Sequence, residues 1–279
     1  MYLDKIEIVA ESVIRVFLFI YYLITKFIKP RVREIHDEEW WMYMNPTGTN
    51  YISFRVLIIF VIINVILFPL TIIFIKKRIN GTVISALLGY TLATLLNISI
   101  TNTLKLLVGR PRPDFYFRCY IEGKKYTVCN GDEDDIIEGL KSFPSGHSSM
   151  SMAAFGFTSL FLIGQLQLFA KQSSLIENTG NPSIRFKFLE PGRFLGCKMV
   201  ICFLPILIAL IVCISRLIDF HHHFDDIAVG AFIGLVCAFI SYRLYFPSLF
   251  NKKSDNPKFE YDIVRSRKNS FKTEMNLAV

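Results

Sequence analysis

Long apolar runs separated by short polar segments dominate the chain. Residues 56–75, 82–104 and 150–170 contain no Asp, Glu, Lys or Arg. Two shorter uncharged runs, residues 199–214 and 227–242, have basic residues close to their ends. About 20 apolar residues in a helix cross a hydrocarbon core of about 30 Å, and long basic side chains can reach back to the interface. All five runs therefore predict membrane-spanning helices.

A sixth span is expected at residues 12–28, although this segment contains Arg15 and Lys26. The pattern as a whole predicts an all-α integral membrane protein, with six transmembrane helices around a helical-bundle core. The alternative is a soluble protein with buried core helices. Three long uncharged runs in one chain argue against it.

The composition agrees with a membrane protein. The 279 residues are 52% hydrophobic and only 19% charged, with a mean hydropathy of +0.42, whereas soluble domains carry about 25% charged residues. A chain with 26 Phe can bury ample surface, which excludes intrinsic disorder. We find no internal repeat, which argues against a repeat array.

The distribution of charge predicts the orientation in the membrane. With six spans and both termini in the cytoplasm, the inner segments hold 18 Lys and Arg against 9 Asp and Glu, and the outer segments hold 13 against 14. Cytoplasmic loops are enriched in Lys and Arg, so we expect cytoplasmic termini. This orientation and anionic cytoplasmic lipid explain the net charge of +8. Without a nucleic-acid-binding motif, no nucleic-acid partner is expected, and the sequence does not indicate an oligomeric state.

The first span is expected to remain in the protein as an anchor. Acidic residues precede its apolar stretch, and no small-residue cleavage site follows, so the pattern is not that of a secretory signal peptide. Farther along, Cys119 and Cys129 lie in one predicted outer loop. On the lumenal or extracellular side they can pair as a disulfide, and two free thiols are the alternative that the sequence leaves open.

Polar residues gather in three clusters, all at outer ends of predicted spans. In the first, Lys105 and Arg112 flank a turn where Pro111 and Pro113 must end the helix. The second is the run Pro144-Ser145-Gly146-His147, which opens the fourth span. A helix N-terminus offers free amides and a positive dipole end to an anion, and glycine lets a ligand approach the backbone.

The third cluster begins with Ser215 and Arg216 at the end of the fifth span and continues into the sixth. It includes three consecutive histidines, residues 221–223, and then Asp226. His222 and Asp226 are four residues apart, so we expect them to share a helical face on which the carboxylate orients the imidazole. Cations, free amides and two histidines together suit phosphoryl transfer, because they can neutralise a phosphate, attack phosphorus and protonate a leaving oxygen.

Two other interpretations of these polar residues are weaker. Adjacent histidines on a helix point in different directions, so residues 221–223 are not expected to bind one metal ion together. Several basic residues of the long outer loop lie outside the three clusters, and most are predicted to be solvated: Arg110, Arg118, Lys124, Lys125 and Lys141.

The three clusters, in this order, resemble the signature of the type 2 phosphatidic acid phosphatases, also called lipid phosphate phosphatases. The matching pattern is Lys105-x6-Arg112-Pro113, then Pro144 to His147, then Ser215-Arg216-x5-His222-x3-Asp226. Within this superfamily the chain looks most like fungal diacylglycerol pyrophosphate phosphatases. The cues are the stretch from Gly109 to Phe115, Arg118-Cys119, the later Cys129, and Tyr-Phe-Pro at 245–247.

The resemblance implies a role for each matching residue. His222 resembles the nucleophile that forms a phosphohistidine, Asp226 its orienting carboxylate, and His147 the acid that protonates the departing oxygen and then activates water. The phosphate-binding set is implied to be Lys105, Arg112, Ser145, Gly146 and Arg216. The spacing to Arg216 and Asp226 selects His222 among the three histidines.

The expected protein is an enzyme that hydrolyses diacylglycerol pyrophosphate to phosphatidate and phosphatidate to diacylglycerol. It is expected to need no Mg²⁺ or other metal and no cofactor. We divide it into an anchor helix with the first outer loop (1–55), a transmembrane phosphatase core (56–246) and a basic cytoplasmic tail (247–279). Its phospholipid substrate would meet the site at the lumenal or extracellular face of a vacuolar, Golgi, ER or plasma membrane.

Three alternatives remain at this point. One keeps the fold and changes the substrate to a polyprenyl pyrophosphate or a sphingoid base phosphate. A second is a lipid phosphotransferase, which moves the phosphoryl group from His222 to an alcohol instead of water. The third is a non-catalytic lipid transporter. The apolar segment 56–104 carries charges only at residues 76–78, at the boundary between two spans, whereas a transport path through the bilayer would favour charged groups midway along a span.

Overall fold

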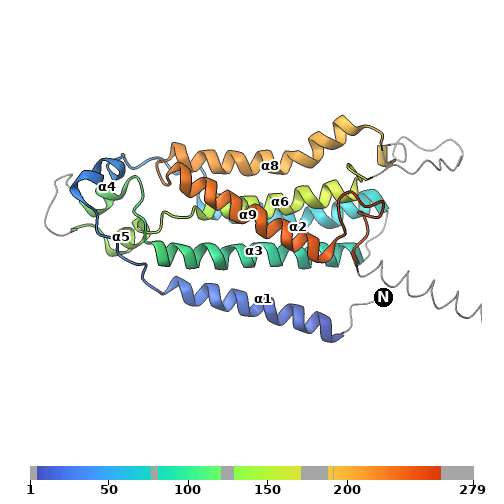
Figure 1. The fold of residues 1–279 in the computed structure, drawn as a ribbon, viewed down its shortest axis with the longest axis horizontal. Coiled ribbons are helices and arrows are strands. Elements are labelled where there is room, and N and C mark those ends of the chain that lie inside the picture. Colours follow the sequence, from blue (N-terminus) through green and yellow to red (C-terminus); the bar gives the residue numbers. More distant parts are fainter. Residues whose placement is uncertain (1–4, 77–80, 121–128, 171–187, 191, 259–279) are drawn as a thin grey trace, which may run out of the picture.

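The computed structural model contains a bundle of long helices lying side by side (Figure 1). It describes residues 5–76, 81–120, 129–170, 188–190 and 192–258. Every secondary-structure element in this part of the chain is a helix, which confirms the all-α prediction. The elements are α1 (Lys5–Lys26), η1 (Asp37–Tyr43), α2 (Phe54–Lys76), α3 (Gly81–Val108), α4 (Phe115–Cys119), α5 (Glu133–Gly139), α6 (Gly146–Gln165), α8 (Leu195–Ile218) and α9 (Phe224–Tyr245).

Four of the described helices are long and apolar enough to cross a membrane: α2, α3, α8 and α9. The expected first and fourth spans are also helices, α1 and α6, but they fall short of this standard. The helix α1 carries Glu11, Arg15 and Lys26 along its apolar stretch, and the serines and glycines of α6 lower its hydropathy. The structure thus supports a membrane protein with several apolar helices.

The helix α6 lies at the centre of the bundle and packs against α2, α3, α8 and α9. Nearly all of its side chains are buried, which explains why it tolerates small polar residues such as Ser148 and Ser151. The largest core cluster lies along this helix, where Phe157 and Phe161 make edge contacts with Phe68. In contrast, α2 exposes large apolar side chains such as Ile62, as a helix facing lipid would.

Two glycines of α9 bring this helix against the start of α6. A Cβ added to Gly230 would lie 2.6 Å from the Ser145 carbonyl oxygen, and one added to Gly234 would lie 2.2 Å from the Ser149 carbonyl oxygen. Small residues spaced by four allow helix backbones to approach closely. The N-terminal ends of α6 and α9 are therefore held next to each other, and both carry residues of the three polar clusters.

Hydrogen bonds join α1 to α3. Asn102 Nδ2 donates to Thr25 Oγ1 at 2.6 Å, and the hydroxyls of Tyr21 and Thr103 are 2.7 Å apart. Farther along α1, Arg15 donates to the carbonyl oxygen of Leu88 at 2.6 Å. Because polar groups are costly in an apolar environment unless they are paired, these bonds fix the face that α1 presents to the bundle.

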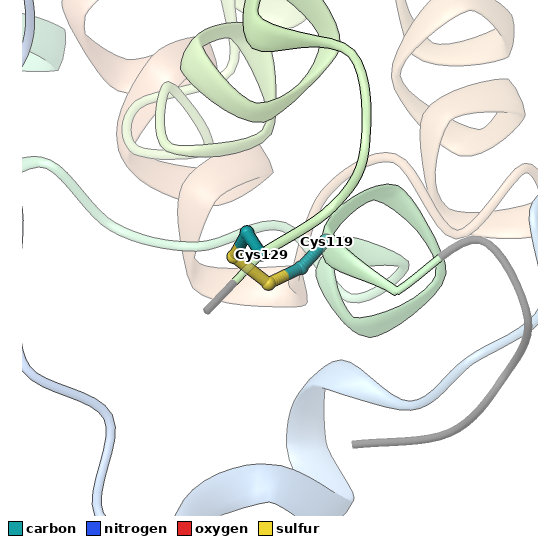
Figure 2. The surroundings of a disulfide bond; sticks show 2 residues. All are labelled: Cys119 and Cys129. Carbon is teal, nitrogen blue, oxygen red and sulfur yellow. A yellow bond between two sulfur atoms is a disulfide. The ribbon is translucent and has the colours of Figure 1, made fainter. Parts of the chain in front are cut away.

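Short helices cover the end of the bundle where the three polar clusters meet (Figure 1). This cover consists of η1, α4 and α5 together with the loops around them, and it packs around its own small core, which includes Tyr43 and Phe115. A disulfide between Cys119 and Cys129 ties the end of α4 to the segment before α5 (Figure 2). The cover is thus a cross-linked structure, and residues 121–128 between the cysteines lie outside the described part.

The close contact between α6 and α9 predicts the effect of a single methyl group. Gly234→Ala places a Cβ against backbone atoms that cannot move aside, and overpacking of this kind costs about 1–3 kcal/mol. We expect the thermal unfolding midpoint of the purified protein in detergent to fall by about 5 °C.

The matched control is Gly196→Ala near the start of α8, where an added Cβ meets nothing within 4 Å. Its unfolding midpoint should match that of the unchanged protein. Equal midpoints for the two variants would contradict the close helix contact.

Candidate active site

The polar clusters meet around a cavity of about 490 Å³ at the covered end of the bundle. Five of the eight residues that the sequence singles out for catalysis or phosphate binding line it: Lys105, Arg112, Gly146, His147 and His222. The other lining residues are Tyr22, Lys26, Phe54, Asn97, Ile98, Thr101, Asn102, Asp134, Glu138, Lys141, Ser149 and Met150. The remaining three predicted residues, Ser145, Arg216 and Asp226, lie behind this lining.

His222 is 3% exposed, and its Nδ1 lies 3.7 Å from Oδ2 of Asp226. This distance is within ion-pair range but longer than a hydrogen bond. The two residues do not share a helical face as predicted, because α9 begins only at Phe224 and His223 is its N-cap. The carboxylate at the third position of the helix closes a capping box with His223 and still approaches His222 from the side.

Asp226 is fully buried and accepts hydrogen bonds from several segments. Arg110 Nη1 donates to its Oδ1 at 2.8 Å, and Ser142 Oγ donates to its Oδ2 at 2.5 Å. The backbone N–H of His223 donates to the same Oδ2 at 2.9 Å. In addition, the backbone carbonyl of Asp226 accepts from the N–H of Ser145 at 2.9 Å. A carboxylate held by this many donors remains ionised and keeps one orientation.

Of the three consecutive histidines, His222 is the one that lines the cavity. His221 Nδ1 lies 2.9 Å from the Asp219 carbonyl oxygen. His223 Nδ1 lies 3.2 Å from Asp226, and its ring meets Tyr43 edge-on with centroids 5.8 Å apart. His221 and His223 therefore have structural contacts of their own, and His222 is the residue available to a ligand.

The last turn of α3 and the segment after it place two cations, Lys105 and Arg112, in the cavity. The helix ends at Val108, before Pro111, and Gly109 has a φ of 59° at a point where a Cβ would overlap the Arg31 carbonyl. Glycine adopts this conformation without strain. Lys105 Nζ donates to the Lys141 carbonyl, and the N–H of Arg112 donates to the Gly139 carbonyl at 2.8 Å.

The positive charge of the Arg112 side chain is only partly balanced by a nearby carboxylate. Its Nη2 lies 3.7 Å from Oε1 of Glu138, and its Nε is buried with no hydrogen-bond partner within the described structure. Burial lowers the pKa of Arg112 from its usual value, yet arginine remains charged in proteins. A planar cation with an unused buried donor is well suited to bind a phosphate oxygen.

The first turn of α6 forms another part of the lining. Ser145 is the N-cap of this helix, and its Oγ accepts from the N–H of Ser148 at 3.4 Å. An added Cβ at Gly146 would approach the Lys105 side chain to 3.6 Å, so this backbone lies beside the lysine. His147 follows, with a buried Nε2 that has no partner among the described residues. Its ring meets Phe54 edge-on, with centroids 5.7 Å apart.

The electrostatic environment of the cavity favours neutral imidazoles. Burial lowers the pKa of His222 well below its usual 6.5; Lys105 and Arg112 lower it further, and Asp226 opposes them. His147 lies in the first turn of α6, before the apolar run that begins at Met150. Burial, followed by the positive charges of Arg216 and Arg112, lowers the pKa of His147 to about 3. A bound phosphate would reverse this effect, because its negative charge stabilises an imidazolium.

Arg216 is predicted to bind phosphate, but it lies behind the cavity and is fully buried. Its Nη2 donates to Asp219 Oδ2 at 2.6 Å, and its Nη1 donates to Asn50 Oδ1 at 2.9 Å. The spacing of three residues between Arg216 and Asp219 was a signal for this ion pair. Asn50 is far away in the sequence, so nothing local indicated its hydrogen bond with Arg216.

Three basic residues expected to be solvated are partly buried and paired. Arg110 binds Asp226 and also contacts Asp225. Arg118 Nη2 lies 2.8 Å from Asp114 Oδ2, and Lys141 lines the cavity. The prediction was wrong for these residues. Arg118 and Lys141 pair with carboxylates only three or four residues away, Asp114 and Glu138, so this spacing was a signal in the sequence. The partners of Arg110 are far away in the sequence, at the start of α9, and nothing local indicated them. Lys124 and Lys125 lie outside the described residues.

No group of three or more His, Cys, Asp or Glu residues in the described ranges is arranged to hold a metal ion. The three histidines illustrate the reason, since each has a different set of neighbours.

Comparisons with known proteins agree with the signature in the sequence. Residues 86–249 match the PAP2 superfamily. Lipid phosphate phosphatase 2 of Arabidopsis thaliana is 34% identical over 191 residues, covering 66% of this chain and 59% of the relative. Diacylglycerol pyrophosphate phosphatase 1 of Saccharomyces cerevisiae is 32% identical over 183 residues, covering 62% and 56%.

A third relative, the probable diacylglycerol pyrophosphate phosphatase 1 of Schizosaccharomyces pombe, is 34% identical over 190 residues, covering 64% of this chain and 61% of the relative. The matched region spans little more than half the length of several of these relatives. No solved structure matches significantly. The matched region, which covers more than half of the chain and contains all three polar clusters, confirms the resemblance: the chain belongs to the PAP2 superfamily, whose members include lipid phosphate phosphatases.

Proposed function

We propose that this protein is a metal-independent phosphatase that converts diacylglycerol pyrophosphate to phosphatidate and phosphatidate to diacylglycerol. One observation carries the proposal: His147 and His222 line the same cavity as Lys105 and Arg112. Two cations can neutralise most of the charge of about −1.5 to −2 on a phosphate monoester, and two imidazoles can supply a nucleophile and an acid. The names of the two fungal relatives support this choice of lipid.

In the first proposed step, Nε2 of His222 attacks the terminal phosphorus. Its Nδ1 faces Asp226, and this carboxylate stabilises the positive charge that the ring acquires. The bond between phosphorus and the leaving oxygen breaks, and its electron pair stays on that oxygen. His147 gives this oxygen a proton, so the lipid departs and a phosphohistidine remains.

In the second proposed step, a water molecule takes the place of the departed lipid. His147, now neutral, accepts a proton as the water oxygen attacks phosphorus. The bond to His222 breaks, its electrons return to the ring nitrogen, and inorganic phosphate leaves. Throughout both steps, Lys105, Arg112 and the amides at the start of α6 stabilise the charge on the phosphoryl oxygens, as fixed donors do in a site sheltered from water.

We also propose that α1 and α6 cross the membrane together with the four more apolar helices. Both run alongside α3 in the bundle, and six crossings leave both termini in the cytoplasm, where the basic tail belongs. The cavity then faces the lumen or the outside of a vacuolar, Golgi, ER or plasma membrane. The disulfide between Cys119 and Cys129 supports this side, because disulfides persist in oxidising compartments.

The direct test is phosphate release by the purified protein from a panel of lipids in detergent micelles. The panel contains diacylglycerol pyrophosphate, phosphatidate, a sphingoid base phosphate and a polyprenyl diphosphate. Release from the first two at the highest kcat/KM supports the proposal. A preference for either of the others would favour the alternative substrate, and binding of all four without release would favour a transporter.

Removal of either cavity histidine should abolish turnover. For His222→Ala and His147→Ala we expect kcat below about one thousandth of the normal value, because each replacement removes a group that forms or breaks a bond. His36→Ala, which changes an exposed histidine in the first outer loop, is the control and should be fully active. Normal turnover in His222→Ala would exclude the phosphohistidine.

Activity should not depend on a divalent metal. Phosphate release after dialysis against excess EDTA should equal that of the untreated protein, because cationic side chains supply the charge in this proposal. Loss of activity that added Mg²⁺ or Zn²⁺ restores would overturn this part of it.

Acidification should not reduce kcat/KM between pH 7.5 and pH 6.5. Because burial holds the pKa of His222 well below 6.5, its ring stays mainly neutral over this range, while a lower pH increases the protonated fraction of His147. The ionisation of the lipid phosphate, with a pKa near 6, is measured separately by phosphorus NMR and divided out. An acid-side loss with a midpoint at 6.5 or above would contradict the buried, neutral nucleophile.

A further inference from the structure

The helix α1 contributes to the cavity, although it lies outside the region that matches the superfamily. Tyr22 and Lys26, at its C-terminal end, both line the cavity. Residues 1–55 are predicted to be an anchor and a loop, so this contribution is not visible in the sequence. The helix α1 thus adds two residues to the cavity that the three polar clusters do not include.

The end of α1 is fixed next to Lys105. Thr25 is buried and accepts the hydrogen bond from Asn102, three residues before Lys105. Just beyond α1, the N–H of Arg31 donates to the carbonyl of Leu106 at 2.8 Å. Lys26 lies between these two anchor points in the sequence, so its backbone is held along the end of α3.

The positively charged side chains of the cavity differ in whether a carboxylate lies close to them. Glu138 lies 3.7 Å from both Arg112 and Lys141. Lys26 has its ammonium 5.0 Å from the centroid of the Tyr22 ring and no ion pair with any carboxylate of the described chain. Its positive charge is therefore available to a ligand in the cavity.

The chemistry of the two proposed substrates differs at one position. In both, the terminal phosphate must lie at His222, where Lys105 and Arg112 can contact it. In a diphosphate ester the leaving group is itself a phosphate, which becomes more negative as the bridging bond breaks. In a monophosphate ester the leaving group is an alcohol oxygen. A further cation that contacts the second phosphate of the diphosphate binds a charged group that the monophosphate lacks.

We propose that Lys26 binds the lipid-side phosphate of a diphosphate ester and so raises the specificity of the site for diphosphates over monophosphates. This inference rests on the proposed function. When His222 takes the terminal phosphoryl group, the electron pair of the broken bond stays on the bridging oxygen of the departing phosphate monoester. Lys26 stabilises that charge, and His147 supplies the proton.

The test compares kcat/KM for diacylglycerol pyrophosphate and phosphatidate at equal surface concentration in detergent micelles. In Lys26→Met the ratio of the two values should fall about tenfold or more, because a hydrogen bond to a charged group is lost only with the diphosphate. Lys26→Arg keeps the charge and should retain most of the ratio. Lys29→Met removes an exposed charge three residues farther on, outside the cavity lining, and should leave the ratio unchanged.

Each outcome has one meaning. An unchanged ratio in Lys26→Met, with both values normal or both reduced equally, overturns the inference and indicates that Lys26 only reaches toward the membrane interface or acts on the shared phosphate. An equal fall of the ratio in Lys29→Met also overturns it, because the effect would then be attraction of anionic lipid to the surface. If the unchanged protein releases phosphate from neither lipid, the proposed function itself fails, which is a different result.

Discussion

The buried carboxylate of Asp226 connects the three parts of the site. It accepts hydrogen bonds from Arg110 in the turn after α3 and from Ser142 before α6, while its own backbone carbonyl holds the N–H of Ser145. A buried charge is stable only when it is paired and hydrogen-bonded. These three segments must therefore come together for Asp226 to be buried, and their arrangement brings His222 next to the first turn of α6.

The helix packing permits this arrangement. Gly230 and Gly234 let α9 lie against the backbone of α6, so the N-terminal ends of two helices meet at one point. Both ends offer amides and the positive end of a dipole, and the amino group of Lys105 lies beside them at the end of α3. The outcome is a cationic cavity at the end of an apolar bundle.

The site separates charges that hold the structure from charges that are free for a ligand. Arg216 is paired with Asp219 and Asn50 behind the cavity, and Arg110 is paired with the aspartates at the start of α9. Lys105, Lys26 and one edge of Arg112 are less compensated. This separation follows from burial, because an unpaired cation is costly deep in the protein and less costly beside a cavity that a charged ligand can enter.

The sequence by itself determined the helical class, the positions of the apolar helices and the residues of the three clusters. These features are encoded locally, by hydrophobic runs, by the prolines after Lys105 and by fixed spacings such as that from Arg216 to His222. Only the tertiary structure decided which groups face the cavity. Asn50, Ser142 and Lys26 reach the site through contacts across long stretches of chain, and such contacts leave no periodicity or spacing in the sequence. Likewise, His222 lies just outside α9 because the capping of that helix, rather than the spacing of four residues, sets where it begins.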